Sequence, residues 1–246
     1  MHSRTRSMVV IGMLGALTVV MGLTGIGFIP IPPVQATIMH LPVILAGVLE
    51  GPAAGGAVGA IFGGFSMYQA ATTGTPISKA LFLNPLIAFL PRILIGIVAA
   101  YGFRVARSRW ARSFTAFLLA ALAARLGYAA WVALKGGSLA TTSFGLMLAG
   151  TLAATAAVIY LLWRGEEAAP GFAAMLGTLT NTVGVLGLGA LFKALPAPLA
   201  WTIGLTNSPA EVFVAMTVTV LVYQGVTRAL GRYRAPQPPS RSAAAI

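Results

Sequence analysis

Arg92 is the charged residue best placed to carry chemistry, because it lies inside a long apolar run of the sequence, directly after Pro91. A charged side chain at membrane depth is costly, and it is kept for a ligand or for a partner. Arg92 could bind an anionic ligand. It could equally pair with Glu211, or with carbonyl groups that the proline leaves without donors. Arg125, in a second apolar run, is expected to have a structural partner.

Glu211 belongs to a helix-start signal. Ser208, Pro209 and Glu211 fit the N-cap, first and third helical positions of a capping box. In this motif the carboxylate accepts a hydrogen bond from the backbone N–H of the N-cap residue. The pattern therefore predicts a helix that begins at Pro209 and carries Glu211 in its first turn.

Neutral polar residues complete the set of candidates. Asn181 follows Thr178 by one helical turn, and both offer donors and acceptors to a neighbouring helix or to a ligand. Asn84 precedes Pro85, so we expect it to cap a helix, and it could also face a pocket. His40 is expected to be a hydrogen-bonded core histidine, because a lone histidine makes no metal site. We expect neither a metal nor a cofactor.

The composition indicates an integral membrane protein. Of 246 residues, 58% are hydrophobic and 8% are charged, and the mean hydropathy is +0.89. The formal net charge of +12 could suggest nucleic acid, but no nucleic-acid-binding motif accompanies it. There is no cysteine, and no Walker A motif, catalytic triad or pair of acids is evident. The sequence therefore does not predict an enzyme.

The segment from Ala36 to Met67 predicts a membrane hairpin that turns around Glu50, Gly51 and Pro52. Its first arm, Thr37 to Leu49, has 13 residues. At about 1.5 Å per residue, this arm cannot cross a hydrocarbon core about 30 Å thick, so it must pack against other protein. The second arm carries three glycines spaced four apart, which form a groove that another backbone can approach: Gly55, Gly59 and Gly63.

The remaining apolar runs predict four further core helices and one added pair. The core runs are Met8 to Phe28, Asn84 to Arg104, Gly171 to Phe192 and Pro209 to Val226. The added pair is Ser113 to Leu134 and Leu139 to Trp163. We expect a polar loop at Gln69 to Lys79, a second loop at Ala194 to Thr206, and a polar tail from Gly231 to Ile246. The prediction is one all-α membrane domain, residues 1–246, of six core helices with a helical insertion at 113–170.

Five short segments carry a resemblance to a known family. They are Ala36 to Val43, Leu49 to Pro52, Pro91 to Gly96, Gly177 to Thr182 and Thr206 to Glu211. With these segments, the chain resembles the substrate-binding S-components of energy-coupling factor (ECF) vitamin transporters, and most of all their pantothenate-type branch. Ser113 to Pro170 has no counterpart in the six-helix pattern of that family.

The resemblance implies a function in vitamin uptake. The expected substrate is pantothenate, with riboflavin or another small vitamin as the alternative. The expected partners are a membrane coupling subunit and two ATPase subunits. The outer helix ends line the vitamin pocket in this family, which gives as candidate binding residues His40, Asn84, Arg92, Asn181, Asn207 and Glu211.

Gly12 and Ala16 form a small-xxx-small face on the first predicted helix. S-components use such a face to contact the coupling subunit, and packing within the chain is nearly as good an account of it.

The distribution of Lys and Arg predicts the orientation. If the N-terminus is cytoplasmic, eleven arginines lie on the inner side, whereas Lys79, Lys135 and Lys193 lie outside. The positive-inside rule favours this arrangement, with both termini cytoplasmic.

Two functions of other classes remain as alternatives: a membrane enzyme and a stand-alone secondary carrier. The sequence has no cluster of His, Asp or Glu for the first and no evident inverted repeat for the second.

Overall fold

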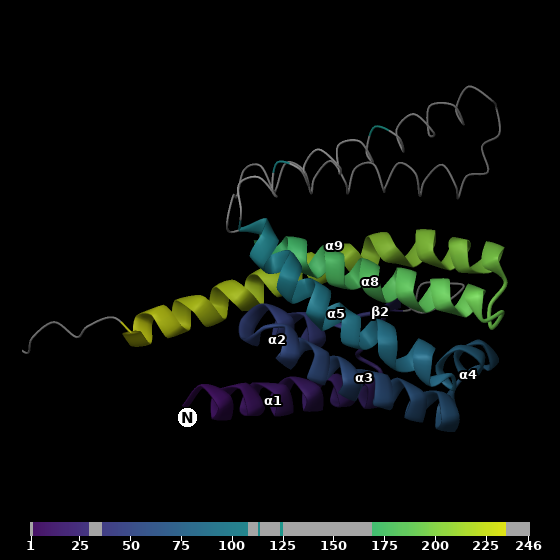
Figure 1. The fold of residues 1–246 in the computed structure, drawn as a ribbon, viewed down its shortest axis with the longest axis horizontal. Coiled ribbons are helices and arrows are strands. Elements are labelled where there is room, and N and C mark those ends of the chain that lie inside the picture. Colours follow the sequence, from purple (N-terminus) through teal and green to yellow (C-terminus); the bar gives the residue numbers. More distant parts are fainter. Residues whose placement is uncertain (1, 30–35, 108–112, 114–123, 125–168, 235–246) are drawn as a thin grey trace, which may run out of the picture.

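The computed structural model describes residues 2–29, 36–107, 113, 124 and 169–234 (Figure 1). Its elements, in chain order, are α1 (His2–Thr24), β1 (Phe28–Ile29), β2 (Ala36–Thr37), α2 (Leu41–Glu50), α3 (Pro52–Thr73), α4 (Pro76–Phe82), α5 (Pro85–Ala106), α8 (Ala169–Leu191) and α9 (Ala197–Arg234). In these ranges the only strands are the antiparallel pair β1 and β2. The predicted insertion lies almost entirely outside the described residues, and so does Arg125.

Four of the described helices contain stretches long and apolar enough to cross a membrane. These stretches are Arg4–Leu23, Pro85–Ala106, Ala169–Leu191 and Glu211–Ala229. Large apolar side chains face outward from them; Met13 is 68% exposed and Phe213 is 70% exposed. A surface of this kind suits lipid rather than water. The prediction of a helical, multi-pass membrane protein is confirmed.

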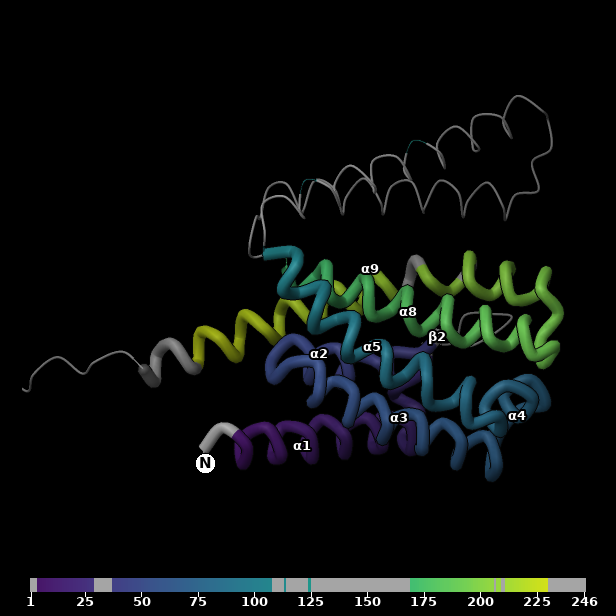
Figure 2. Tube along the Cα trace, in the orientation of Figure 1, coloured from purple at the N-terminus to yellow at the C-terminus, as the bar shows by residue number. Residues whose placement is uncertain are grey.

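The short helix α2 lies at the centre of the bundle (Figure 2). It contacts α1, α3, α5, α8 and α9, and every residue from Leu41 to Val48 is buried. The turn into α3 is made at Gly51, whose φ of 99° is a conformation that favours glycine. The prediction that the first arm of the hairpin packs against other protein is therefore correct.

The glycine groove of α3 receives the backbone of α5. A Cβ at Gly55 would lie 2.8 Å from the backbone of Gly96, and one at Gly63 would lie 2.8 Å from the Ala88 carbonyl oxygen. At Gly59 an added Cβ would overlap the carbonyl group of Arg92. The two helices approach this closely because the contact face of α3 carries no side chains. This approach fixes the height of Arg92 in the bundle.

The predicted start of the last helix at Pro209 is wrong. α9 begins at Ala197, directly after Pro196, and it continues through the segment predicted as a loop. Ala200 and Ile203 in that segment pack in a buried cluster with Leu81. Apolar burial therefore outweighs the hydrogen bond that a proline inside a helix removes. The capping box is absent, because Glu211 lies well inside the helix.

The predicted loop between the hairpin and α5 is also largely helical. α3 continues to Thr73, and the short helix α4 follows it. Thr75 caps α4 by accepting a hydrogen bond from the backbone N–H of Ser78 at 3.2 Å. This extra helix places Phe82 close to the start of α5.

The two ends of the bundle differ in the basic residues that they expose. α1 begins at the end where α5 finishes, whereas α4 and the turn from α8 to α9 lie at the opposite end (Figure 1). The first end carries the exposed residues Arg4, Arg104 and Arg228. There Arg6 also pairs with Glu50 at 2.9 Å, which ties α1 to the end of α2. The opposite end carries the exposed Lys79 and Lys193.

Candidate functional site

Arg92 lies in the core of the bundle and is 3% exposed. Its Nη1 donates a hydrogen bond of 2.8 Å to the carbonyl oxygen of Ile87. Two aromatic rings contact its guanidinium group: the centroid of Phe82 lies 4.4 Å from Cζ, and that of Phe62 lies 5.4 Å away. Cation–π contacts of this kind stabilise a cation that has lost its water. α3, α4 and α5 therefore all contribute to holding Arg92.

The bond to Ile87 follows from the neighbouring proline. Residue 91 would normally donate its backbone N–H to the carbonyl of residue 87, but Pro91 has no N–H. Arg92 supplies the missing donor. Of the structural roles predicted for Arg92, pairing with a freed carbonyl is thus confirmed, whereas no ion pair joins Arg92 to Glu211 in the part of the chain that the structure describes.

Arg92 keeps donors beyond this structural bond. Its Nε is buried and has no hydrogen-bond partner among the described residues. A guanidinium group has five N–H donors in one plane, and the hydrogen bond to Ile87 uses one of them. The edge formed by Nε and Nη2 therefore remains suited to a planar anion such as a carboxylate.

Glu211 is buried, 4% exposed, and joins three elements. Its Oε1 accepts a hydrogen bond of 2.7 Å from the backbone N–H of Thr37 in β2. Its Oε2 lies 3.4 Å from the hydroxyl of Thr182 in α8, which donates the second bond. The carboxylate thus holds the β1–β2 hairpin against α8 and α9.

His40 is hydrogen-bonded, as predicted. The Thr178 hydroxyl donates to the carbonyl of Ala174 at 2.9 Å, so its oxygen accepts from Nε2 of His40 at 3.0 Å. Burial lowers the pKa of His40 to about 4, and the positive charge of Arg92 lowers it further in the same direction. His40 is therefore neutral at pH 7, and it lies within electrostatic reach of Arg92.

The three asparagines differ in position. Asn181 is 5% exposed, and its Oδ1 has no hydrogen-bond partner among the described residues. Asn207 is buried as well, at 4% exposed. Asn84 is the N-cap of α5, accepting a hydrogen bond of 3.0 Å from Leu86 N–H, as predicted. No described contact links Asn84 to the buried polar residues.

We use the name polar core for the buried polar residues contributed by the start of α2, α5, α8 and α9: His40, Arg92, Thr178, Asn181, Asn207 and Glu211. Five of these six residues were candidates from the sequence, and Thr178 was named beside Asn181. The sequence did not indicate Phe62 and Phe82, because nothing in its pattern predicts α4 or its contact with Arg92.

The sequence comparison decides the class of protein. A family model described as ECF transporter, substrate-specific component, matches residues 6–223. The chain belongs to this family. Membership in the ECF substrate-specific components makes it the substrate-binding part of a membrane transporter, and it argues against enzymatic activity.

Two curated relatives are similar to this ECF component. The pantothenate transporter PanT of Leuconostoc mesenteroides is 34% identical over 92 residues, which is 36% of this chain and 43% of that protein. The pantothenic acid transporter PanT of Lactococcus lactis subsp. cremoris is 25% identical over 219 residues, which is 80% of each chain. The resemblance found in the sequence motifs is confirmed.

The face predicted to contact a coupling subunit lies on the outside of this ECF component. Gly12 has no atom of the described structure within 4 Å of an added Cβ, and Ala16 is exposed. α1 packs on α3 through a different face, where a Cβ at Gly15 would lie 2.6 Å from the Ile61 side chain. Packing within the described chain therefore does not explain Gly12 and Ala16.

Proposed function

We propose that this chain binds pantothenate in the polar core and passes it across the membrane together with a separate coupling subunit and two ATPase subunits. The observation that carries the proposal is Arg92, a buried guanidinium group with an unpaired Nε. A cation in this position is stabilised further by an anionic ligand. Pantothenate carries one carboxylate group.

The contacts of Arg92 indicate how a carboxylate would bind. Phe62 and Phe82 contact the guanidinium group, and Nη1 is used by Ile87. We infer that the carboxylate binds side-on, with one oxygen on Nε and the other on Nη2. Such a bidentate pair is directional as well as strong, so it would fix the orientation of the ligand.

Neutral groups of the polar core match the rest of pantothenate. The ligand has an amide and two hydroxyl groups beyond its carboxylate, and these need donors and acceptors that carry no charge. Asn181 offers an amide with an unbonded Oδ1, and Asn207 lies buried on the neighbouring helix. Both relatives described above are named as transporters of this vitamin.

Riboflavin, the alternative vitamin, fits this arrangement less well. It has no anionic group at neutral pH, so it would occupy the polar core without pairing with Arg92. Pantothenate is therefore the substrate that the chemistry of the site favours.

The assembly follows the pattern of the family. We propose that α1, α2, α3, α5, α8 and α9 are the six core helices of one membrane domain that spans residues 1–246, with 113–170 as an insertion. The arginine-rich end of the bundle faces the cytoplasm, in agreement with the positive-inside rule, and both termini lie there. Gly12 and Ala16 then contact the coupling subunit within the membrane.

A binding screen tests this proposal. Purified protein in detergent would be titrated with pantothenate, riboflavin and other B vitamins by isothermal calorimetry. We expect saturable binding of pantothenate alone. Tight binding of an uncharged vitamin, with no binding of pantothenate, would contradict the proposed substrate. The assembly is tested by purifying the chain from its membrane together with its partners, and recovery of no ATPase subunit would contradict it.

A further inference from the structure

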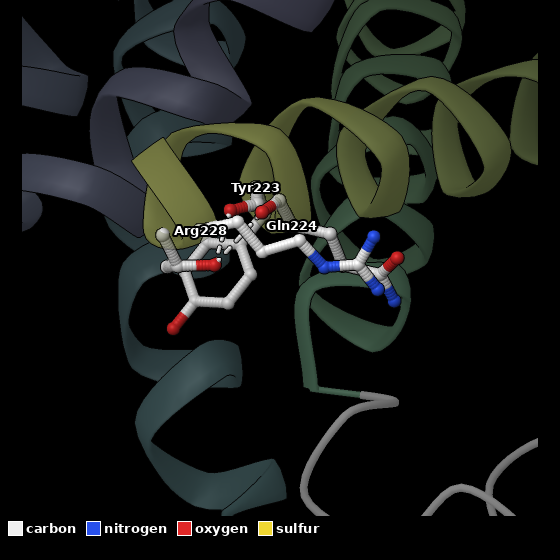
Figure 3. Close-up of a pocket in the computed structure, with 4 residues that line it drawn as sticks. Tyr223, Gln224 and Arg228 are labelled. Atoms are coloured by element: carbon white, nitrogen blue, oxygen red, sulfur yellow. Dashed lines mark hydrogen bonds between the residues drawn. The ribbon is translucent and has the colours of Figure 1, made fainter. Parts of the chain in front are cut away.

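A small cavity of about 190 Å³ lies along the second half of α9, at the arginine-rich end of the bundle. It is lined by Tyr223, Gln224, Thr227 and Arg228. Figure 3 shows Tyr223, Gln224 and Arg228 extending from the same stretch of the helix. Gln224 and Arg228 offer a neutral amide and a guanidinium group toward the same side in Figure 3, donors that suit a phosphate oxygen, whereas the hydroxyl of Tyr223 points the other way.

The cavity lies at the level where a membrane meets water. The apolar stretch of α9 ends at Ala229, and that of α5 ends at Ala106. The two ends are level with each other, because the ring of Tyr223 contacts that of Phe103 with centroids 5.3 Å apart. Tyr and Arg are typical of this interfacial depth, with the ring or stem in the apolar layer and the polar tip among headgroups.

The positive charge of Arg228 is available to a ligand in this position. It is exposed, and it makes no ion pair or hydrogen bond within the described part of the chain. The acidic residue described at this end, Glu50, is already paired with Arg6. An anion that approaches Arg228 therefore meets a positive field with no described carboxylate left unpaired beside it.

Apolar side chains continue the surface toward the membrane. Leu221 directly precedes the cavity in α9 and is 63% exposed, and Val222 is 37% exposed. A soluble phosphate would leave this apolar surface uncovered, whereas the acyl chains of a phospholipid would cover it.

We propose that the cavity lined by Tyr223, Gln224, Thr227 and Arg228 binds the phosphate headgroup of an anionic phospholipid. Basic pockets on the surface of membrane helices commonly recognise such headgroups. The site is separate from the polar core, so it stands or falls independently of the proposed vitamin.

Native mass spectrometry of the detergent-purified chain tests the proposal. Wild-type protein would be titrated with phosphatidylglycerol and with phosphatidylcholine, and bound lipid would be counted. We expect preferential retention of phosphatidylglycerol. The variant Arg228→Gln should weaken that retention about fivefold, as expected for the loss of one interfacial arginine, and Arg228→Lys should restore most of it.

A matched control separates a built site from general surface charge. Arg4 is an exposed arginine at the same end of the bundle, on α1, so Arg4→Gln removes the same charge elsewhere. Retention of phosphatidylglycerol by Arg4→Gln at the wild-type level supports the site. Equal losses in the two glutamine variants, or no loss in either, overturn it.

Two further measurements complete the experiment. Inorganic phosphate and glycerol phosphate would each be added at the same concentration as the lipid, and displacement of the lipid by either would overturn the assignment to a lipid. The thermal midpoint of each variant without added lipid would confirm that Arg228→Gln is folded. A folded variant that keeps wild-type lipid selectivity contradicts the proposal.

Discussion

Arg92 donates to the carbonyl oxygen of Ile87 at 2.8 Å, the acceptor that Pro91 leaves without a backbone donor. The residue after the proline thus replaces the hydrogen bond that the proline removes. Arg92 contributes to the folding of α5 through Nη1, and it has further donors for a ligand. Any substitution of Arg92 therefore acts on both roles, and an experiment must separate them.

The glycine groove of α3 gives the first prediction. Gly59→Ala places a Cβ against the backbone of Arg92 and should destabilise the protein by about 1 to 3 kcal/mol, the range typical of overpacking. Gly59→Leu should give no folded protein. Gly56→Ala is the matched control on the same helix, because its Cβ would meet side-chain atoms at an ordinary 3.7 Å. Thermal unfolding in detergent measures all three. Normal expression and ligand binding by Gly59→Leu would contradict this account of the helix contact.

The outer face of α1 gives the second prediction. Gly12→Leu combined with Ala16→Leu should leave ligand binding unchanged, since no described atom lies within 4 Å of a Cβ at Gly12. Uptake and formation of the complex with the coupling subunit should be lost. Gly15→Leu is the control, because it faces Ile61 inside the bundle and should lower stability and binding together. If the double variant also fails to bind ligand, the face is used for packing.

Glu211 gives the third prediction. Glu211→Ala removes the acceptor of the Thr37 backbone N–H and frees the β1–β2 hairpin from α9. The expected cost is about 1.5 to 3 kcal/mol, typical of a hydrogen bond to a charged group. Glu211→Gln keeps one acceptor oxygen, so its stability should lie between that of wild type and that of Glu211→Ala. Calorimetric titration should show weaker binding of pantothenate and of its neutral amide analogue alike. Tighter binding of the acid alone, with the amide unaffected, would show that Glu211 acts on the ligand charge.

His40 gives a pH dependence. Its pKa falls from about 6.5 in the unfolded chain to about 4 in the folded one, so the unfolded chain binds the proton more tightly. The stability that neutral His40 provides is complete above pH 6.5, and it is lost as the pH falls toward 4, by at most about 1.4 kcal/mol per pH unit. The thermal midpoint of wild type should therefore fall more steeply between pH 7 and pH 5 than that of His40→Gln. Parallel curves for the two proteins would contradict the assignment.

The sequence predicted the buried parts of the fold better than its helix ends. The short arm around Leu45 and the groove at Gly59 followed from length and spacing alone, because both are local properties of the chain. The start of α9 did not follow, since the packing of Ile203 against Leu81 joins residues far apart in sequence. Local signals at Pro209 pointed to a helix start that this distant contact overrides.

The candidate site divides in the same way. Burial of Arg92 and the freed carbonyl beside Pro91 could be anticipated, because both depend on residues within one helical turn. The contact of Phe82 with Arg92 and the bond from Thr37 to Glu211 could not, because each joins separate elements through their final packing.

The acid and amide forms of pantothenate test the central claim most directly. Arg92→Gln removes the guanidinium group, so the free acid should bind at least about tenfold to a hundredfold more weakly, because one charge-assisted hydrogen bond alone accounts for a loss of that size and the carboxylate accepts two. The neutral amide analogue should bind nearly as it does to wild type. Arg104→Gln, which removes an exposed arginine from the far end of the same helix, is the control and should leave both affinities unchanged.

Isothermal titration of both ligands against these three proteins is the decisive measurement. The proposed site predicts a loss for the acid in Arg92→Gln and almost none for the amide. Equal losses for the two ligands would mean that Arg92 serves only the structure of α5, and unchanged affinity for both would contradict its place in the binding site.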